Sequence, residues 1–95
     1  MSSKAQRKSE VILMYVTTVH LPEIADVAEF VNIMSRFRFE AQLHVGSYSV
    51  DAKSIMGIFT LDREQPIQLE AFVTDEAEQA KLNEALGRFL YHPVH

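Results

Sequence analysis

The sequence predicts an α+β fold in which helices cover one face of a four-stranded antiparallel sheet. Short segments with apolar residues at every second position alternate with segments whose apolar residues recur every three or four positions, as in strands and helices respectively. Their order is βαββαβα, which suits a layered sandwich. The 95 residues are enough for one small core. We expect a single domain over residues 10–91, between a polar tail at 1–9 and a short tail at 92–95.

The first strand is predicted at residues 11–18, where β-branched and aromatic residues dominate. Successive side chains alternate across a strand. Those expected to face the core are Ile12, Met14 and Val16. Those expected on the opposite face are Val11, Leu13 and Tyr15. Because this second face is too apolar for open water, and Phe72 of a later strand extends it, it predicts a homodimer or another partner surface.

A helix is predicted from about residue 22 to 36. Pro22 suits a first helical turn, where its missing N–H costs nothing, and Glu23 meets the positive end of the helix dipole. Apolar residues recur at helical spacing, and the expected stripe is Ile24, Val27, Ala28, Val31 and Met34, widened by Phe30, Ile33 and Phe37.

A β-hairpin is predicted next. Residues 39–45 alternate apolar and polar side chains, the apolar ones being Phe39, Ala41, Leu43 and Val45. Gly46 and Ser47 mark a tight turn, and residues 48–50 give a short partner strand.

The C-terminal half is predicted to form a short helix, a strand and a last helix. Ser54 precedes the helical run IMGIFTL, Pro66 breaks the chain, and residues 67–72 alternate as the fourth strand. Thr74 or Asp75 caps the last helix. Its expected buried stripe is Ala77, Leu82, Leu86, Phe89 and Leu90.

Composition argues against several classes of protein. The formal net charge is −4 and the folded part has no basic patch, which argues against a nucleic-acid surface. Without cysteine there can be no disulfide, thiol nucleophile or cysteine-held zinc. The longest apolar run, residues 11–16, is too short to span a membrane. No secretory signal is recognisable, so we expect a cytoplasmic protein that binds no membrane, metal or cofactor.

Residues 50–61, VDAKSIMGIFTL, carry the motif with the clearest functional meaning. Ser54 lies at the start of a short helix, where a serine hydroxyl normally accepts a hydrogen bond from a free backbone N–H. A phosphate on the same hydroxyl would lie at the positive end of the helix dipole and would be tolerated. Structural capping and regulatory phosphorylation are therefore both open for Ser54.

This stretch resembles the regulatory-serine segment of HPr, the phosphocarrier of the bacterial phosphoenolpyruvate:sugar phosphotransferase system. Residues 53–57, KSIMG, match that signature, and the resemblance extends over most of the chain. It implies the HPr open-faced sandwich and phosphorylation of Ser54 by an ATP-dependent HPr kinase/phosphorylase. It also implies a partner-binding patch of Lys53, Ile55, Met56 and Phe59. The implied partners are that kinase, other phosphotransferase system proteins and a LacI-type transcriptional regulator.

The chain departs from this resemblance at the phosphocarrier site. HPr carriers start their first helix with His-x-Arg-Pro, in which the histidine accepts the phosphoryl group and the arginine holds the anion. In gapless alignment, Glu23 stands at the histidine position and Ala25 at the arginine position. A carboxylate there would repel an incoming phosphoryl group. Catabolite repression HPr is similar in lacking the histidine and keeping the serine, so we expect a non-enzymatic regulatory or binding module.

Two alternatives remain. His20, three residues before Glu23, is the candidate acceptor if the protein is an active phosphocarrier with a rearranged loop. An HPr-fold assembly domain without phosphorylation is the other. The remaining histidines, His44 on the polar face of a strand and His92 and His95 in the terminal tail, show no metal-ligand pattern.

Overall fold

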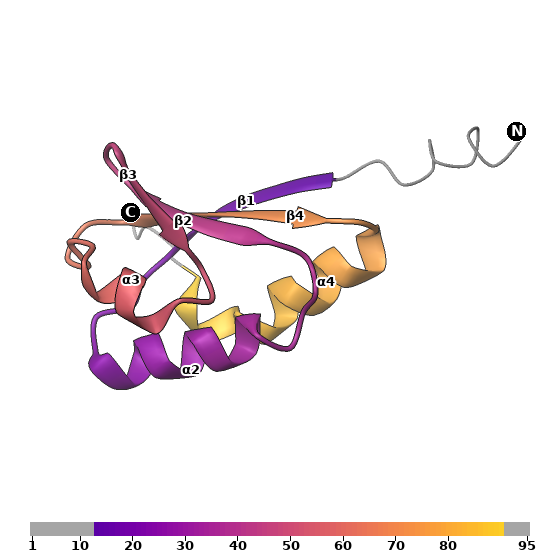
Figure 1. The fold of residues 1–95 in the computed structure, drawn as a ribbon. Helices are drawn as coiled ribbons and strands as arrows, with labels where there is room; N and C mark the ends of the chain where they lie inside the picture. The colour runs from indigo at the N-terminus through magenta and orange to yellow at the C-terminus, as the bar shows by residue number, and fades with distance from the viewer. Residues whose placement is uncertain (1–12, 91–95) are drawn as a thin grey trace, which may run out of the picture.

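The structure has one four-stranded sheet with all of its helices on one face (Figure 1). This computed structural model describes residues 13–90, and the tails expected at 1–9 and 92–95 lie outside that range. The strand order is β1-β4-β2-β3, and every pair is antiparallel. The predicted α+β sandwich is confirmed.

The elements follow the predicted order βαββαβα. The strands are β1 (Leu13–Val19), β2 (Ala41–Val45), β3 (Tyr48–Asp51) and β4 (Ile67–Val73). The helices are α2 (Ile24–Met34), α3 (Ile55–Phe59) and α4 (Glu76–Ala85), followed by the 3₁₀ turn η2 (Gly87–Phe89). None of the helices within residues 13–90 has both the length and the apolar character that crossing a bilayer requires.

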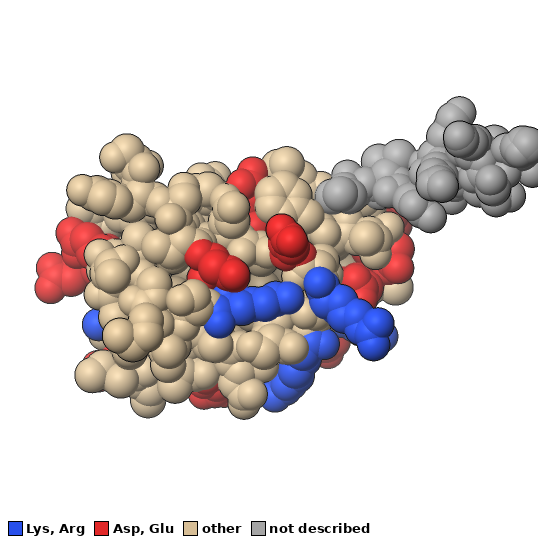
Figure 2. Space-filling model, in the orientation of Figure 1, with Lys and Arg blue, Asp and Glu red and all other residues tan. Residues whose placement is uncertain are grey.

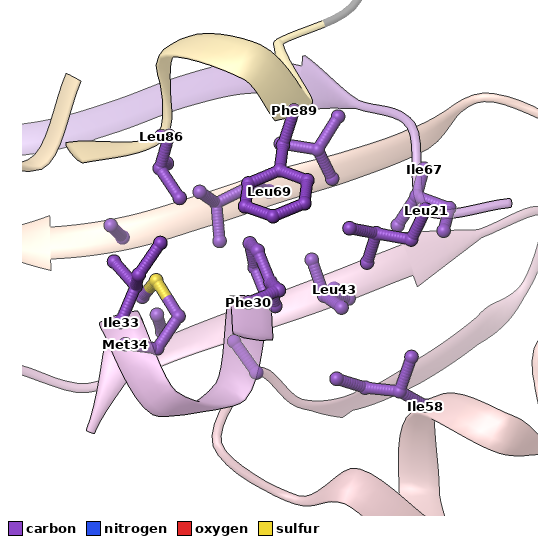
Figure 3. Close-up of a cluster of buried hydrophobic side chains, with 14 of the residues drawn as sticks. Leu21, Phe30, Ile33, Met34, Leu43, Ile58, Ile67, Leu69, Leu86 and Phe89 are labelled. Atoms are coloured by element: carbon purple, nitrogen blue, oxygen red, sulfur yellow. The ribbon is translucent and has the colours of Figure 1, made fainter. Parts of the chain in front are cut away.

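The hydrophobic core fills the space between the sheet and the helices. Phe30 of α2 meets Phe89 of η2 edge to face, with ring centroids 6.2 Å apart. Both rings belong to the same core cluster as Leu69 of β4 and Leu43 of β2 (Figure 3). Among the described residues, no polar or charged residue is buried. Apolar burial is therefore the main source of stability in this layer.

β1 turns its side chains to the faces opposite to those predicted. Leu13 and Tyr15 lie half-buried against the core, whereas Met14 and Val16 are 55% and 46% exposed. The register with β4 explains this, because Tyr15 pairs with the fully buried Ala71. Both sets of alternate residues are apolar, so their composition does not decide which set faces inward. The predicted partner face of Val11, Leu13 and Tyr15 is wrong at its two described residues, and Val11 and Ile12 lie outside the described range.

α2 begins later than predicted and buries a rotated stripe. Glu23 is the N-cap, so Pro22 precedes the helix instead of occupying its first turn. Ile24 is 68% exposed, and Ala28 is also exposed. The buried residues of the helix are Val27, Phe30, Ile33 and Met34. This stripe is centred on Phe30, whose larger side chain buries more apolar area than Ala28 could.

The hairpin and the last two elements agree more closely with the prediction. Phe39, Ala41, Leu43 and Val45 are all buried. Gly46 has a φ of 60° in the two-residue turn, a conformation that glycine adopts without strain. Asp75 caps α4, since its Oδ1 accepts from the Glu78 N–H at 2.7 Å. The predicted burial of Ala77 is wrong, because Ala77 is exposed in the first turn of α4.

Candidate functional site

Ser54 is the N-cap of α3 and lies in a turn held by several hydrogen bonds. Its Oγ accepts a hydrogen bond from the Gly57 N–H at 3.1 Å, and its carbonyl oxygen accepts from the Ile58 N–H at 3.0 Å. Asp51 holds the preceding turn, with Oδ1 accepting from the Lys53 N–H at 2.8 Å and its carbonyl oxygen from the Ser54 N–H at 3.0 Å. The predicted capping role of Ser54 is confirmed. The half-buried Ser54 is thus held by hydrogen bonds with Asp51, Gly57 and Ile58, all within its own turn and helix.

Gly57 leaves room for the Ser54 hydroxyl. A Cβ atom at position 57 would lie 3.1 Å from Ser54 Oγ and 3.3 Å from Val50 Cβ. Both separations are shorter than ordinary van der Waals contact, and packed interiors resist such crowding. Glycine at this position therefore lets α3 approach β3 closely while the hydroxyl keeps its capping geometry.

Three large apolar side chains of α3 remain exposed, and we call them the α3 patch. They are Ile55 at 37%, Met56 at 71% and Phe59 at 36% exposure. Lys53 borders the patch, and its ammonium group donates to the Phe37 carbonyl oxygen at 2.8 Å. Figure 2 shows Lys and Arg side chains gathered where the end of α2 meets the start of α3. The four residues predicted as a partner patch thus lie together, with apolar surface beside positive charge.

The N-terminus of α2 is an acidic site. The Glu23 N–H donates to Asp26 Oδ2 at 3.0 Å. Arg88 of η2 donates to Asp26 Oδ1 at 3.1 Å and to Glu29 Oε1 at 2.6 Å. These contacts, the hydrogen bond to Glu29 first, raise the pKa of Arg88. Ala25 is exposed and supplies no charge, and the guanidinium group of Arg88 is engaged by two of these acids.

A pocket of about 470 Å³ beside the start of α2 contains both His20 and Arg63. Arg63 Nη1 donates to the carbonyl oxygens of Leu21 at 3.1 Å and Pro22 at 3.2 Å. Sequence reasoning missed Arg63, because it is 41 positions from Pro22 and carries no local signal. Two acidic residues, Asp62 and Glu64, line the same pocket. His20 therefore lines the same pocket as one arginine and two carboxylates.

His44 belongs to a hydrogen-bonded network on the open face of the sheet, which the sequence did not indicate. Its Nε2 lies 3.0 Å from Glu70 Oε1, and its Nδ1 lies 2.7 Å from Ser49 Oγ. A carboxylate only accepts, so in the neutral ring Nε2 donates to Glu70 and Nδ1 accepts from the Ser49 hydroxyl. The network joins β3, β2 and β4 across the sheet.

Replacing His44 by alanine is expected to lower the free energy of unfolding by about 1 kcal/mol, because it removes two cross-strand hydrogen bonds at a partly exposed site. Urea denaturation at neutral pH measures the change. Gln42→Ala, on the same face of β2, is the matched control and should cost clearly less. Equal losses for the two variants would show that the network adds nothing beyond ordinary strand packing.

Metal ligation finds no support in the described part of the chain. Residues 13–90 contain no group of three His, Asp or Glu side chains arranged to hold an ion. His92 and His95 lie outside that range.

Known proteins agree with this fold. The family described as the PTS HPr component phosphorylation site matches residues 24–90. The chain belongs to the HPr family. A solved structure, the crystal structure of HPr-C-His from Thermoanaerobacter tengcongensis, matches this HPr-family protein with a TM-score of 0.59 and 28% sequence identity, over 74% of this chain and 84% of that chain. No curated protein matches the chain. Membership of the phosphotransferase system family is thus confirmed.

Proposed function

We propose that this HPr-family protein is a non-catalytic regulatory or binding module that is switched by phosphorylation at Ser54 and does not relay phosphate through a histidine. The observation that carries the proposal is the carboxylate at the start of α2. Glu23 is the N-cap residue of that helix, and its N–H bonds to a second acid, Asp26. In the family resemblance this is where the phosphocarrier histidine stands.

The charges around Glu23 oppose transfer of a phosphoryl group to this helix end. An acceptor site needs positive charge directed at the phosphoryl oxygens. Here Asp26 and Glu29 engage Arg88, and Ala25 replaces the arginine that the resemblance would require. An incoming dianion would therefore meet carboxylates, and the nearby Arg63 has its Nη1 engaged by the carbonyl oxygens of Leu21 and Pro22.

Ser54 and the α3 patch support the regulatory part of the proposal. A phosphate at Ser54 would add a charge of about −1.5 to −2 directly beside Ile55 and Met56, both exposed. Such a charge changes which surface can dock on an apolar patch, disfavouring an apolar partner and favouring an arginine-bearing one. By resemblance, the modifying enzyme is an HPr kinase/phosphorylase and the responding partner is a LacI-type regulator or a phosphotransferase system protein.

The second candidate function is a phosphocarrier that uses His20. The observation in its favour is the shared pocket with Arg63. Against it, Arg63 Nη1 is occupied by two backbone carbonyl oxygens, and Asp62 and Glu64 line the same pocket. An assembly domain without phosphorylation is the third candidate.

Mass spectrometry after two separate phosphorylation reactions tests these functions. We expect acid-stable phosphate on Ser54 after incubation with ATP and HPr kinase/phosphorylase, and no acid-labile phosphate after incubation with phosphoenolpyruvate and enzyme I. The Ser54→Ala variant should take up no phosphate from ATP, whereas Ser49→Ala, which removes another serine hydroxyl near a turn, should behave as the parent does.

Other outcomes would identify the other candidates. Acid-labile phosphate that disappears in a His20→Gln variant would establish the carrier. Absence of phosphate in both reactions would leave the assembly domain, and kinase-dependent phosphate on Ser54→Ala would contradict the proposed switch.

A further inference from the structure

Ser49, His44 and Glu70 form a hydrogen-bonded series on the open face of the sheet, and we call these three residues the Ser49 series. Ser49 Oγ lies 2.7 Å from His44 Nδ1, and His44 Nε2 lies 3.0 Å from Glu70 Oε1. A hydroxyl within hydrogen-bond reach of an imidazole that a third group orients is the arrangement of an activated serine. Such arrangements are recognised by geometry and not by the order of the residues in the chain.

Three neighbouring strands hold the Ser49 series in place. His44 of β2 and Ser49 of β3 are directly opposite each other in the register, so their side chains lie on the same face. On the other side of β2, Glu70 of β4 pairs with Gln42, which is two residues from His44 and therefore shares its face. The hydroxyl, the imidazole and the carboxylate are thus positioned by strands of one sheet and not by loops.

Glu70 determines which ring nitrogen of His44 can act as a base. A carboxylate only accepts hydrogen bonds, so it favours the neutral ring that is protonated at Nε2. In that ring, Nδ1 carries the lone pair and faces Ser49 Oγ. His44 Nδ1 can therefore take the hydroxyl proton when the serine oxygen attacks an electrophile.

The serine is open to solvent. Ser49 is exposed, and His44 and Glu70 keep 25% and 27% of their side-chain surface exposed. β3 is the edge strand farthest from β1, whereas the first and last described residues, Leu13 and Leu90, both lie at β1. A small reagent can therefore reach Ser49 Oγ from the open face of the sheet.

We propose that Ser49 is a self-acylation site that takes an acyl group from esters with a good leaving group. Ser49 Oγ attacks the carbonyl carbon, and His44 Nδ1 takes the hydroxyl proton. The bond between Oγ and the carbonyl carbon forms as the bond from that carbon to the leaving oxygen breaks. The leaving group departs with the electron pair as a stable anion, and His44 then releases the proton to water. Glu70 is a positioning residue. The chain is modified once without turnover, and the step does not depend on phosphorylation of Ser54.

Incubation of the full chain with p-nitrophenyl acetate, followed by peptide mapping by mass spectrometry, tests the site. Ser47 is the matched control, because it is an exposed serine in the turn of the same hairpin. We expect Ser49 to be acetylated roughly 100-fold faster than Ser47, since general-base assistance contributes about 10²- to 10⁴-fold. Equal rates at the two serines would overturn the proposal. So would acetylation of the His44 ring while Ser49 stays unmodified.

The His44→Gln variant separates the base from the hydrogen bond. A glutamine side chain can still hydrogen-bond to Ser49 but cannot take its proton. Acetylation of Ser49 should therefore fall to the rate of Ser47, while circular dichroism and thermal melting show that the variant is folded. Acetylation at the parent rate would mean that no base acts from this position.

Nitrogen-15 NMR of the His44 ring tests the part of Glu70. In the neutral form we expect a proton on Nε2 in the parent and a mixture of both tautomers in Glu70→Gln, with acetylation of Ser49 about tenfold slower in the variant. A neutral ring protonated at Nδ1 in the parent would overturn the proposal, because the nitrogen facing Ser49 would then have no lone pair for its proton. An unchanged acetylation rate in Glu70→Gln would contradict the positioning role.

Discussion

Replacing Phe30 by alanine is expected to lower the free energy of unfolding by about 3 to 5 kcal/mol, because the change leaves a large cavity in a packed core. Phe30 is completely buried, and its edge-to-face contact with Phe89 joins α2 to η2. It also lies over the middle of the sheet (Figure 3). Since small domains are stable by only about 5 to 15 kcal/mol, this one substitution should remove a large part of the total.

Equilibrium urea denaturation followed by circular dichroism measures the loss. Ile24→Ala is the matched control on the same helix. Ile24 is 68% exposed, so its truncation should change stability by no more than about 0.5 kcal/mol. Comparable losses for the two variants would mean that the α2 face packed on the sheet is not the one centred on Phe30.

The buried face of an element was predicted correctly from the sequence where only one of its faces is apolar. In β2, polar residues separate Ala41, Leu43 and Val45, so only one orientation of the strand buries apolar area. The structure shows this orientation, with all three residues buried. β1 is apolar at both sets of alternate positions, and the pattern therefore could not decide that Tyr15 faces the helices. In α2, apolar residues surround more than half of the helix, which explains why Ile24 was assigned to the buried stripe although it is exposed.

In the candidate site, the local contacts could be predicted from the sequence and the long-range contacts could not. Ser54 was predictable because N-capping involves only the next turn, here the N–H of Gly57. The contacts of Arg63 and Arg88 with the start of α2 could not be predicted, since each contact joins residues at least 41 positions apart. Such contacts depend on how the loop before β4 and the turn η2 pack, which no local pattern encodes.

The start of α2 illustrates how these distant residues change the chemistry of a locally predictable helix end. The sequence predicted that the carboxylate of Glu23 lies at the start of the helix. The structure adds that the Asp26 carboxylate accepts from both the Glu23 N–H and Arg88. The charge of Arg88 is therefore committed to ion pairs with Asp26 and Glu29, whereas Arg63 donates to backbone carbonyl oxygens before the helix. Our proposal that this helix end receives no phosphoryl group accordingly rests on the carboxylates of Glu23 and Asp26.

Replacing Met56 by aspartate is expected to lower kcat/KM for phosphorylation by HPr kinase/phosphorylase by roughly 30-fold, equivalent to about 2 kcal/mol, as for a central apolar contact of an interface. Met56 is 71% exposed and is the most exposed side chain of the α3 patch, so its replacement does not alter the buried core. The new carboxylate would also have to be desolvated beside Ile55 whenever a partner covers the patch, which adds to the cost.

Steady-state kinetics with ATP and the kinase, together with a thermal melt, separate docking from stability. Tyr48→Asp is the matched control, since Tyr48 is 73% exposed and belongs to β3. It introduces the same charge on an exposed apolar residue outside the α3 patch, so its kcat/KM should stay within about twofold of the parent. Equal losses for both variants would indicate a general effect of net charge. Full activity of Met56→Asp would mean that the kinase reaches Ser54 without touching the α3 patch, and the modified serine would then act on partners through some other surface.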